Sequence, residues 1–235
     1  MQPKPVFTTL LILLSAACNK VKQDLPKVNI QTTLLPGKTN TIPAQSKYKN
    51  VLILGNSITY SPINESIGWN KACGMAATSP DLDYVHLLGL HFKFAKITAV
   101  NISQFEREYQ TYEPEQYLKE YRDLKPDLII MRIGENLPII DSALFRQKYK
   151  SLLNYLRSNN PNVKVIAGLS FWPDRDDADN IIKQYSPYVT LKVLSGDISN
   201  YAFGLYTDSG VQQHPSDKGM KAIANLLWDG ITKLK

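Results

Sequence analysis

Residues 50–57 read NVLILGNS, and this stretch decides the fold class. A short apolar run that ends in glycine is typical of a strand buried on both faces of a sheet. Further apolar runs follow at residues 96–102, 127–134, 163–169 and 188–194, and helical patterns occupy residues 83–94, 114–124, 141–158, 178–185 and 216–234. This alternation predicts an α/β fold, a three-layer α/β/α sandwich around a five-stranded, mostly parallel sheet.

Composition and charge limit the function classes. The chain has 235 residues, 43% of them apolar, which suits one large globular domain or two small ones. Its two cysteines are too few for a disulfide scaffold. The net charge of +6 arises mostly from residues 19–47, which hold five Lys against Asp24, whereas residues 48–235 carry 21 basic and 20 acidic side chains. An excess confined to one segment argues against a nucleic-acid partner.

The N-terminus has the features of an export signal. Residues 6–14 form an apolar run, which Ser15-Ala16-Ala17-Cys18 follows. This run is shorter than the roughly 20 residues that a bilayer-spanning helix needs. Small residues before a cysteine resemble a bacterial lipoprotein signal, in which residues 1–17 are removed and Cys18 is lipidated. An ordinary cleaved signal peptide is the alternative.

The lipoprotein interpretation predicts an exported protein, held at the bacterial cell envelope, at the outer membrane, by its lipid anchor only. Residues 18–47 contain three prolines and no sustained period, and are predicted to be a flexible linker. Residues 48–235 are predicted to form the domain.

Polar residues follow the ends of predicted strands. Asn56 and Ser57 follow the first strand, Asn136 follows the third, and His214 lies in the loop that enters the last helix. In open α/β sheets, ligands bind outside the carboxyl ends of the strands. A hydroxyl, an imidazole and an amide at one rim are the groups that nucleophilic acyl transfer needs. Taken singly, Ser57 could also be a helix cap and Asn136 a turn residue.

Four segments resemble, in order, the sequence blocks of the SGNH (GDSL-type) hydrolases. They are Gly55-Asn56-Ser57-Ile58-Thr59, residues 69–86 (WNKACGMAATSPDLDYVH), Ile133-Gly134-Glu135-Asn136, and residues 214–220 (HPSDKGM). The resemblance spans about residues 50–228 and implies a flavodoxin-like fold, ester hydrolysis, and neither a metal nor a cofactor.

The resemblance also implies a role for each matched residue. Ser57 would be the nucleophile, and His214 the base that later protonates the leaving alcohol. The N–H groups of Ser57 and Gly74 and the side chain of Asn136 would stabilise the oxyanion.

One position departs from the family pattern. The family places an Asp three residues before the His, where this chain has Val211. The nearest upstream acid is Asp208, with Gly210 between them to permit a turn. We predict that Asp208 orients His214; a main-chain carbonyl that orients a Ser57–His214 pair is the alternative.

The predicted function is a lipid-anchored, carbohydrate-esterase-like serine esterase that hydrolyses small acyl esters, with an O-acetylated glycan as the expected substrate. The alternatives are a lipase, arylesterase or thioesterase of the same fold, and a glycan-binding lipoprotein without activity. Of the remaining candidates, His86, His91 and Cys73 are interpreted as structural. Arg132 could pair with Glu135 or bind an anionic substrate group, and Trp69 and Trp172 could bind a sugar or pack internally. The sequence does not predict the oligomeric state.

Overall fold

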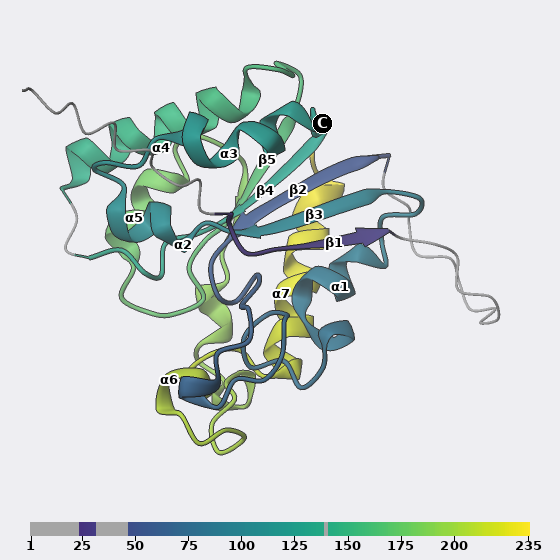
Figure 1. Ribbon diagram of the computed structural model, residues 1–235, viewed down its shortest axis with the longest axis vertical. Helices are drawn as coiled ribbons and strands as arrows, with labels where there is room; N and C mark the ends of the chain where they lie inside the picture. The colour runs from purple at the N-terminus through teal and green to yellow at the C-terminus, as the bar shows by residue number, and fades with distance from the viewer. Residues whose placement is uncertain (1–23, 32–46, 139–140) are drawn as a thin grey trace, which may run out of the picture.

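The computed structural model describes residues 24–31, 47–138 and 141–235. The predicted signal peptide and Cys18 lie outside these residues. Six strands form one sheet in the order β1-β3-β2-β4-β5-β6 (Figure 1). The strands are β1 (Lys27–Gln31), β2 (Asn50–Gly55), β3 (Lys96–Asn101), β4 (Leu128–Arg132), β5 (Lys164–Gly168) and β6 (Tyr188–Val189). β1 is antiparallel to β3, and every other pair is parallel. The predicted α/β class and mostly parallel sheet are confirmed.

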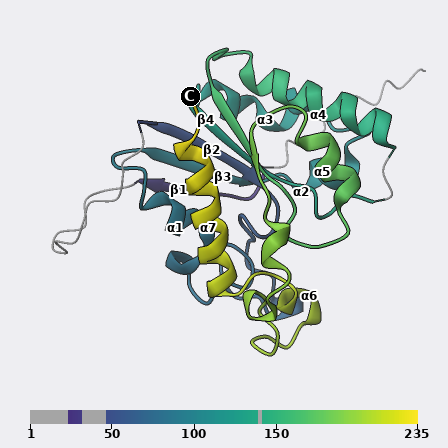
Figure 2. The same ribbon diagram turned by 180° about the vertical axis from the view of Figure 1, so that it is seen from behind.

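Helices cover both faces of the sheet. One face carries α1 (Tyr84–Gly89) and α7 (Asp217–Thr232). The other carries α2 (Ser103–Glu108), α3 (Pro114–Asp123), α4 (Ser142–Arg157) and α5 (Asp176–Ile182), as the view from behind also shows (Figure 2). The one-turn α6 (Ser209–Gln212) lies beyond the end of the sheet. Short 3₁₀ turns occupy Glu65–Ile67, Pro80–Leu82, Lys192–Leu194 and Ile198–Asn200.

The apolar run in β2 is continuous because both of its faces are buried. Val51 and Ile53 belong to the core cluster on the α7 side, and Leu52 and Leu54 to the cluster on the α4 side. Alternate side chains of a strand point to opposite faces, so a strand between two helical layers is apolar at every position. This packing fixes the end of β2, and therefore the start of the loop that carries Ser57.

The first strand corrects the predicted linker and the predicted strand count. Residues 24–31 were expected in a flexible tether, but Lys27–Gln31 pairs with β3. Leu25 is buried, and Val28 and Ile30 pack against the core. The linker prediction is wrong for these residues, because their alternating polar and apolar pattern suits an edge strand with one covered face. The sheet therefore has six strands rather than five.

Two predicted elements are shorter than expected. The strand expected at residues 188–194 has only two residues in the sheet, because the chain turns into the 3₁₀ turn Lys192–Leu194. The helix expected at residues 83–94 ends at Gly89; tight turns follow, and Phe94 adopts a left-handed φ of 58° that no right-handed helix contains. Within the described residues, no helix is both long and apolar enough to cross a membrane.

Candidate active site

The strand order places the polar loops at one point of the sheet. Without β1, the order β3-β2-β4-β5-β6 is that of a doubly wound fold whose connections reverse direction between β2 and β4. Ligands bind at such a reversal, outside the carboxyl ends of the strands. Ser57 follows β2 and Asn136 follows β4, so both residues lie at this position.

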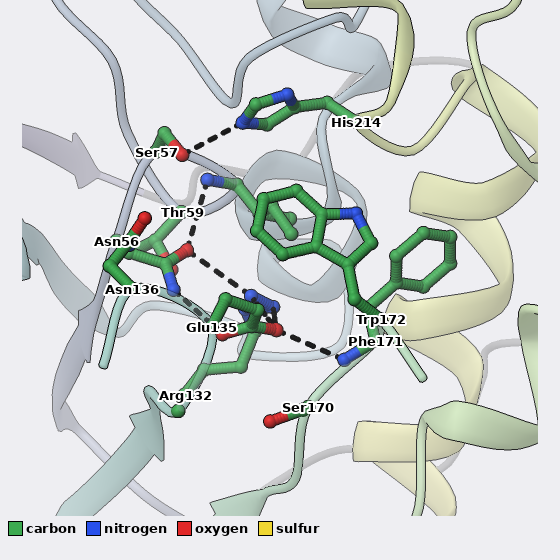
Figure 3. Close-up of polar contacts among 12 residues, drawn as sticks. Asn56, Ser57, Thr59, Arg132, Glu135, Asn136, Ser170, Phe171, Trp172 and His214 are labelled. Atoms are coloured by element: carbon green, nitrogen blue, oxygen red, sulfur yellow. Dashed lines mark hydrogen bonds and ion pairs between the residues drawn. The ribbon is translucent and has the colours of Figure 1, made fainter. Parts of the chain in front are cut away.

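Ser57 and His214 are in direct contact. The Oγ of Ser57 lies 2.9 Å from the Nε2 of His214, although 157 positions separate them in the chain (Figure 3). Two main-chain hydrogen bonds fix the loop around His214. The N–H of His214 donates to the carbonyl of Val211, and the carbonyl of His214 accepts from the N–H of Ala202. Ser57 is half-buried, so its hydroxyl is within reach of a ligand. The predicted pairing of hydroxyl and imidazole is present.

The other ring nitrogen of His214 contacts the main chain. Its Nδ1 lies 2.8 Å from the carbonyl oxygen of Gly210, in α6. A carbonyl only accepts, so Nδ1 must carry the proton and Nε2 must present its lone pair to Ser57. A single turn of helix, which no pattern in the sequence indicates, thus selects the tautomer that a base needs.

Asp208 does not have the predicted role. Its carboxylate caps α6, where Oδ1 accepts from the N–H of Val211 at 2.9 Å. The two ring nitrogens of His214 contact Ser57 and Gly210 instead. The prediction that Asp208 orients the imidazole is therefore wrong, and the alternative of a main-chain carbonyl is the observed arrangement. An acid directly before a helical turn satisfies the free N–H groups of that turn.

The surroundings of His214 keep its imidazole neutral. Burial lowers the pKa of His214, and Arg132 lowers it further, while the Gly210 carbonyl and Glu135 act in the opposite direction. The result is a pKa of about 4, compared with the ordinary value of 6.5. His214 is therefore a free base throughout the neutral and mildly acidic range.

The expected oxyanion donors differ in their availability. Within the described part of the chain, the N–H of Ser57 makes no hydrogen bond. Asn136 donates one hydrogen of Nδ2 to Glu106 at 2.8 Å, which leaves the second hydrogen of that amide for another acceptor. The N–H of Gly74 instead donates to the buried carboxylate of Asp83 at 3.0 Å. The predicted role of Gly74 is not supported, because its donor has an internal partner.

A buried polar network lies beneath these residues, and only part of it was predicted. Arg132 forms an ion pair with Glu135 at 2.7 Å, and its guanidinium also donates to Asn56. The N–H of Phe171 donates to the same Glu135 carboxylate. Arg132 is fully buried, so it pairs with Glu135 and does not bind substrate. Contacts between residues far apart in the chain leave no local pattern, so the rest of the network has no signal in the sequence.

The other singled-out side chains have structural contacts. His86 pairs with Asp83, and His91 stacks on Trp228 with ring centroids 4.4 Å apart. Cys73 is fully buried, and burial raises the pKa of its thiol to about 12, so it is no nucleophile at neutral pH. Trp172 packs edge-on against the His214 ring at 5.4 Å, beside the candidate site.

Comparisons with known proteins show the fold. No protein-family model matches the chain, nor does the sequence of any curated protein. A carbohydrate esterase family 2 enzyme with a carbohydrate-binding domain from Corynascus thermopiles (Myceliophthora fergusii) is 16% identical, with a TM-score of 0.52 over 83% of this chain and 68% of that chain.

Two further solved structures are similar. A family two carbohydrate esterase from Clostridium thermocellum, in complex with cellohexaose, is 14% identical, with a TM-score of 0.50 over 81% of this chain and 65% of that chain. A salicylyl-acyltransferase from a tetracycline biosynthetic pathway is 18% identical, with a TM-score of 0.52 over 80% and 55%. The fold expected from the SGNH resemblance is confirmed.

We predict that Ser57 reacts with a fluorophosphonate probe and that the reaction persists in acid. Protonation of Nε2 prevents His214 from accepting the serine proton. Since the pKa of His214 is lowered, the labelling rate should stay constant down to about pH 5 and fall with a midpoint near pH 4. Labelling measured across this range, with Ser57→Ala as the blank, tests the prediction. A midpoint above pH 6 would contradict it.

A second prediction concerns Asp208. Asp208→Asn should react with the fluorophosphonate probe at a rate within about threefold of the wild-type rate. Asparagine is an equally good helix cap, and the carboxylate does not contact His214. Loss of the acid in a serine-protease triad costs about 10⁴ in rate. Asp197→Asn, at another capping acid, is the matched control. A hundredfold loss in Asp208→Asn alone would show that the acid acts on the imidazole.

Proposed function

We propose that this chain, which has the fold of the SGNH hydrolases, is a serine ester hydrolase. The observation that carries the proposal is the contact between Ser57 and His214, with the imidazole oriented by the Gly210 carbonyl. This pair lies where the connections of the sheet reverse, the place at which folds of this type bind ligands.

The geometry supports a two-step reaction. Nε2 of His214 takes the proton of Ser57 as Oγ attacks the carbonyl carbon of the ester. The negative charge on the carbonyl oxygen is stabilised by the N–H of Ser57 and the free hydrogen of the Asn136 amide. Collapse of this intermediate expels the alcohol, which takes the proton from His214. Water then attacks the acyl-enzyme by the same route and releases the acid.

Two substitutions test this function with p-nitrophenyl acetate. Ser57→Ala and His214→Ala should each lower kcat by on the order of 10⁴ or more, and the double variant should be little worse than either. The losses are non-additive because the two side chains act as one unit. Full activity in Ser57→Ala would overturn the proposal, whereas complete inactivity of a folded wild-type protein on esters would favour the glycan-binding alternative.

We further propose that the substrate is an O-acetylated carbohydrate. A groove of about 720 Å³ adjoins His214 through Trp172. Tyr201 and Phe203 stack on each other in its wall with ring centroids 5.0 Å apart, and Phe203 is 46% exposed. Arg175 adds hydrogen-bond donors. Aromatic faces beside polar donors suit a sugar ring, and the family 2 carbohydrate esterases share this fold.

The groove predicts a difference between substrates. Phe203→Ala should raise KM for an acetylated xylo-oligosaccharide about tenfold, because the sugar loses its stacking surface. The effect on p-nitrophenyl acetate should be smaller, since that substrate has no sugar ring. Leu205→Ala removes an exposed apolar side chain of the same surface loop, 58% exposed, that does not line the groove, and serves as the control. Equal effects of Phe203→Ala on both substrates would show that the groove does not bind the sugar.

We also propose that Cys18 carries a lipid anchor at the cell envelope. Because Lys27–Gln31 joins the sheet and Leu25 is buried, the proposed tether is shortened to residues 19–23, a length of chain that spans at most about 20 Å. β1 begins at the end of the sheet that carries Ser57, where Asn101 donates to the carbonyls of both Pro26 and Tyr60. The anchored protein would therefore hold its active site close to the membrane surface.

The anchor is tested by fractionation. Cys18→Ala should move the protein from the membrane fraction to the soluble fraction, with kcat/KM for p-nitrophenyl acetate unchanged, because the residue lies outside the domain. Mass spectrometry of the wild-type N-terminus provides the second measurement. Cleavage at another bond, with Cys18 unmodified or absent, would refute the anchor.

A further inference from the structure

Glu106 is a buried carboxylate that the reaction above does not use. It lies on α2, which follows β3, and it reaches beneath Asn56 to the loop after β4. Its side chain is inaccessible to solvent, although the other acid of the same helix, Glu108, is exposed. A buried carboxylate without partners would be strongly unfavourable, so its contacts reveal what it holds in place.

Every partner of Glu106 is a hydrogen-bond donor. Oε1 accepts from the N–H of Gly134 at 2.6 Å, the N–H of Asn136 at 3.3 Å and the Nδ2 of Asn56 at 3.3 Å. Oε2 accepts from the Nδ2 of Asn136 at 2.8 Å. Burial and the neighbouring Glu135 raise the pKa of Glu106 above its ordinary value, and the donors on Asn136 and Gly134 offset only part of this rise. Among the described residues, all four hydrogen-bond contacts of Glu106 come from donors, so its two oxygens act as acceptors.

Asn136 is held by this carboxylate at two points. Its main-chain N–H contacts Oε1 and its side-chain Nδ2 contacts Oε2. The second contact fixes the orientation of the side-chain amide, since only its NH₂ group can donate to a carboxylate. The remaining hydrogen of Nδ2 then has a fixed direction. Without Glu106, the carbonyl and NH₂ ends of Asn136 could exchange places.

We propose that Glu106 is a positioning residue, which fixes the Asn136 amide so that it presents an N–H, and not a carbonyl oxygen, to the reacting ester. The proposal rests on the function proposed above and adds a residue to it. Glu106 does not touch the substrate. It acts only through Asn136, so its effect requires that Asn136 be present.

Glu106→Gln tests this with almost no change of shape. The introduced amide has one acceptor where the carboxylate had two. Its NH₂ group cannot take the place of Oε1, where the N–H groups of Gly134 and Asn136 converge. It must take the place of Oε2 and face the Nδ2 of Asn136. The repulsion between these two NH₂ groups is relieved when the Asn136 amide flips. The flip also turns the N–H of Asn136 away from the reacting centre.

The expected result is a loss in kcat with little change in KM. With p-nitrophenyl acetate, Asn136→Ala and Glu106→Gln should each lower kcat by on the order of 10²–10³, with KM within about threefold. The double variant should be no slower than Asn136→Ala alone, since the second change has nothing left to disturb. Glu108→Gln makes the same change at an exposed site of the same helix and should keep wild-type rates.

Four outcomes separate the explanations. Multiplied losses in the double variant would show that Glu106 supports the fold in general and would overturn the positioning role, as would a Glu106→Gln enzyme of near-full kcat. If Glu106→Gln does not fold, as judged by thermal unfolding, Glu106→Asp keeps the charge but withdraws it by one methylene, and the same non-additivity with Asn136→Ala is required. Should Ser57→Ala retain full activity in the same assay, the proposed function fails first, independently of Glu106.

Discussion

The buried ion pair between Arg132 and Glu135 holds the loops of the candidate active site in place. The two side chains are 0% and 1% exposed, and removing charges from water is unfavourable unless their other groups are also satisfied. Glu135 meets this condition by accepting from Asn56 and from the N–H of Phe171. The loops after β2, β4 and β5 thus share one carboxylate. Loss of one partner would leave a buried charge unpaired, at a cost of about 3–5 kcal/mol, so the position of Ser57 depends on this pair.

The acidic side chains around the candidate site position main-chain loops and helix ends rather than His214, the proposed base. Glu135 joins three loops, Glu106 holds the loop after β4, and Asp83 binds the N–H of Gly74 and caps α1. Asp208 likewise caps α6 and thereby places the Gly210 carbonyl beneath His214. Carboxylates that accept from main-chain N–H groups fix the backbone positions of the loops. This matters because the proposed oxyanion donors lie on separate loops and must point at the same substrate oxygen.

The parts that the sequence predicts correctly are those set by local pattern. Strands buried on both faces are continuously apolar, and α4 begins one residue after its capping Asp141, so their limits were predictable. The strand Lys27–Gln31 escaped prediction because an edge strand alternates polar and apolar residues as a linker also can. The N–H of Gly74 donates to Asp83, and the Nδ1 of His214 contacts the Gly210 carbonyl. These hydrogen-bond partners depend on how the loops fold in three dimensions, and no spacing in the sequence indicates them.

The core itself excludes an acid at the position where the family resemblance expects one. Val211 is 1% exposed and packs in the cluster that contains Met220, so a carboxylate there would be buried among apolar side chains. The Gly210 carbonyl orients the imidazole instead, but a dipole stabilises the imidazolium less than a full charge does. That difference agrees with the low pKa of His214. In the proposed reaction, less of the transition-state stabilisation then comes from the imidazole side, and more must come from the oxyanion donors. A rigidly held Asn136 is therefore more important in this chain than in one whose histidine contacts an acid.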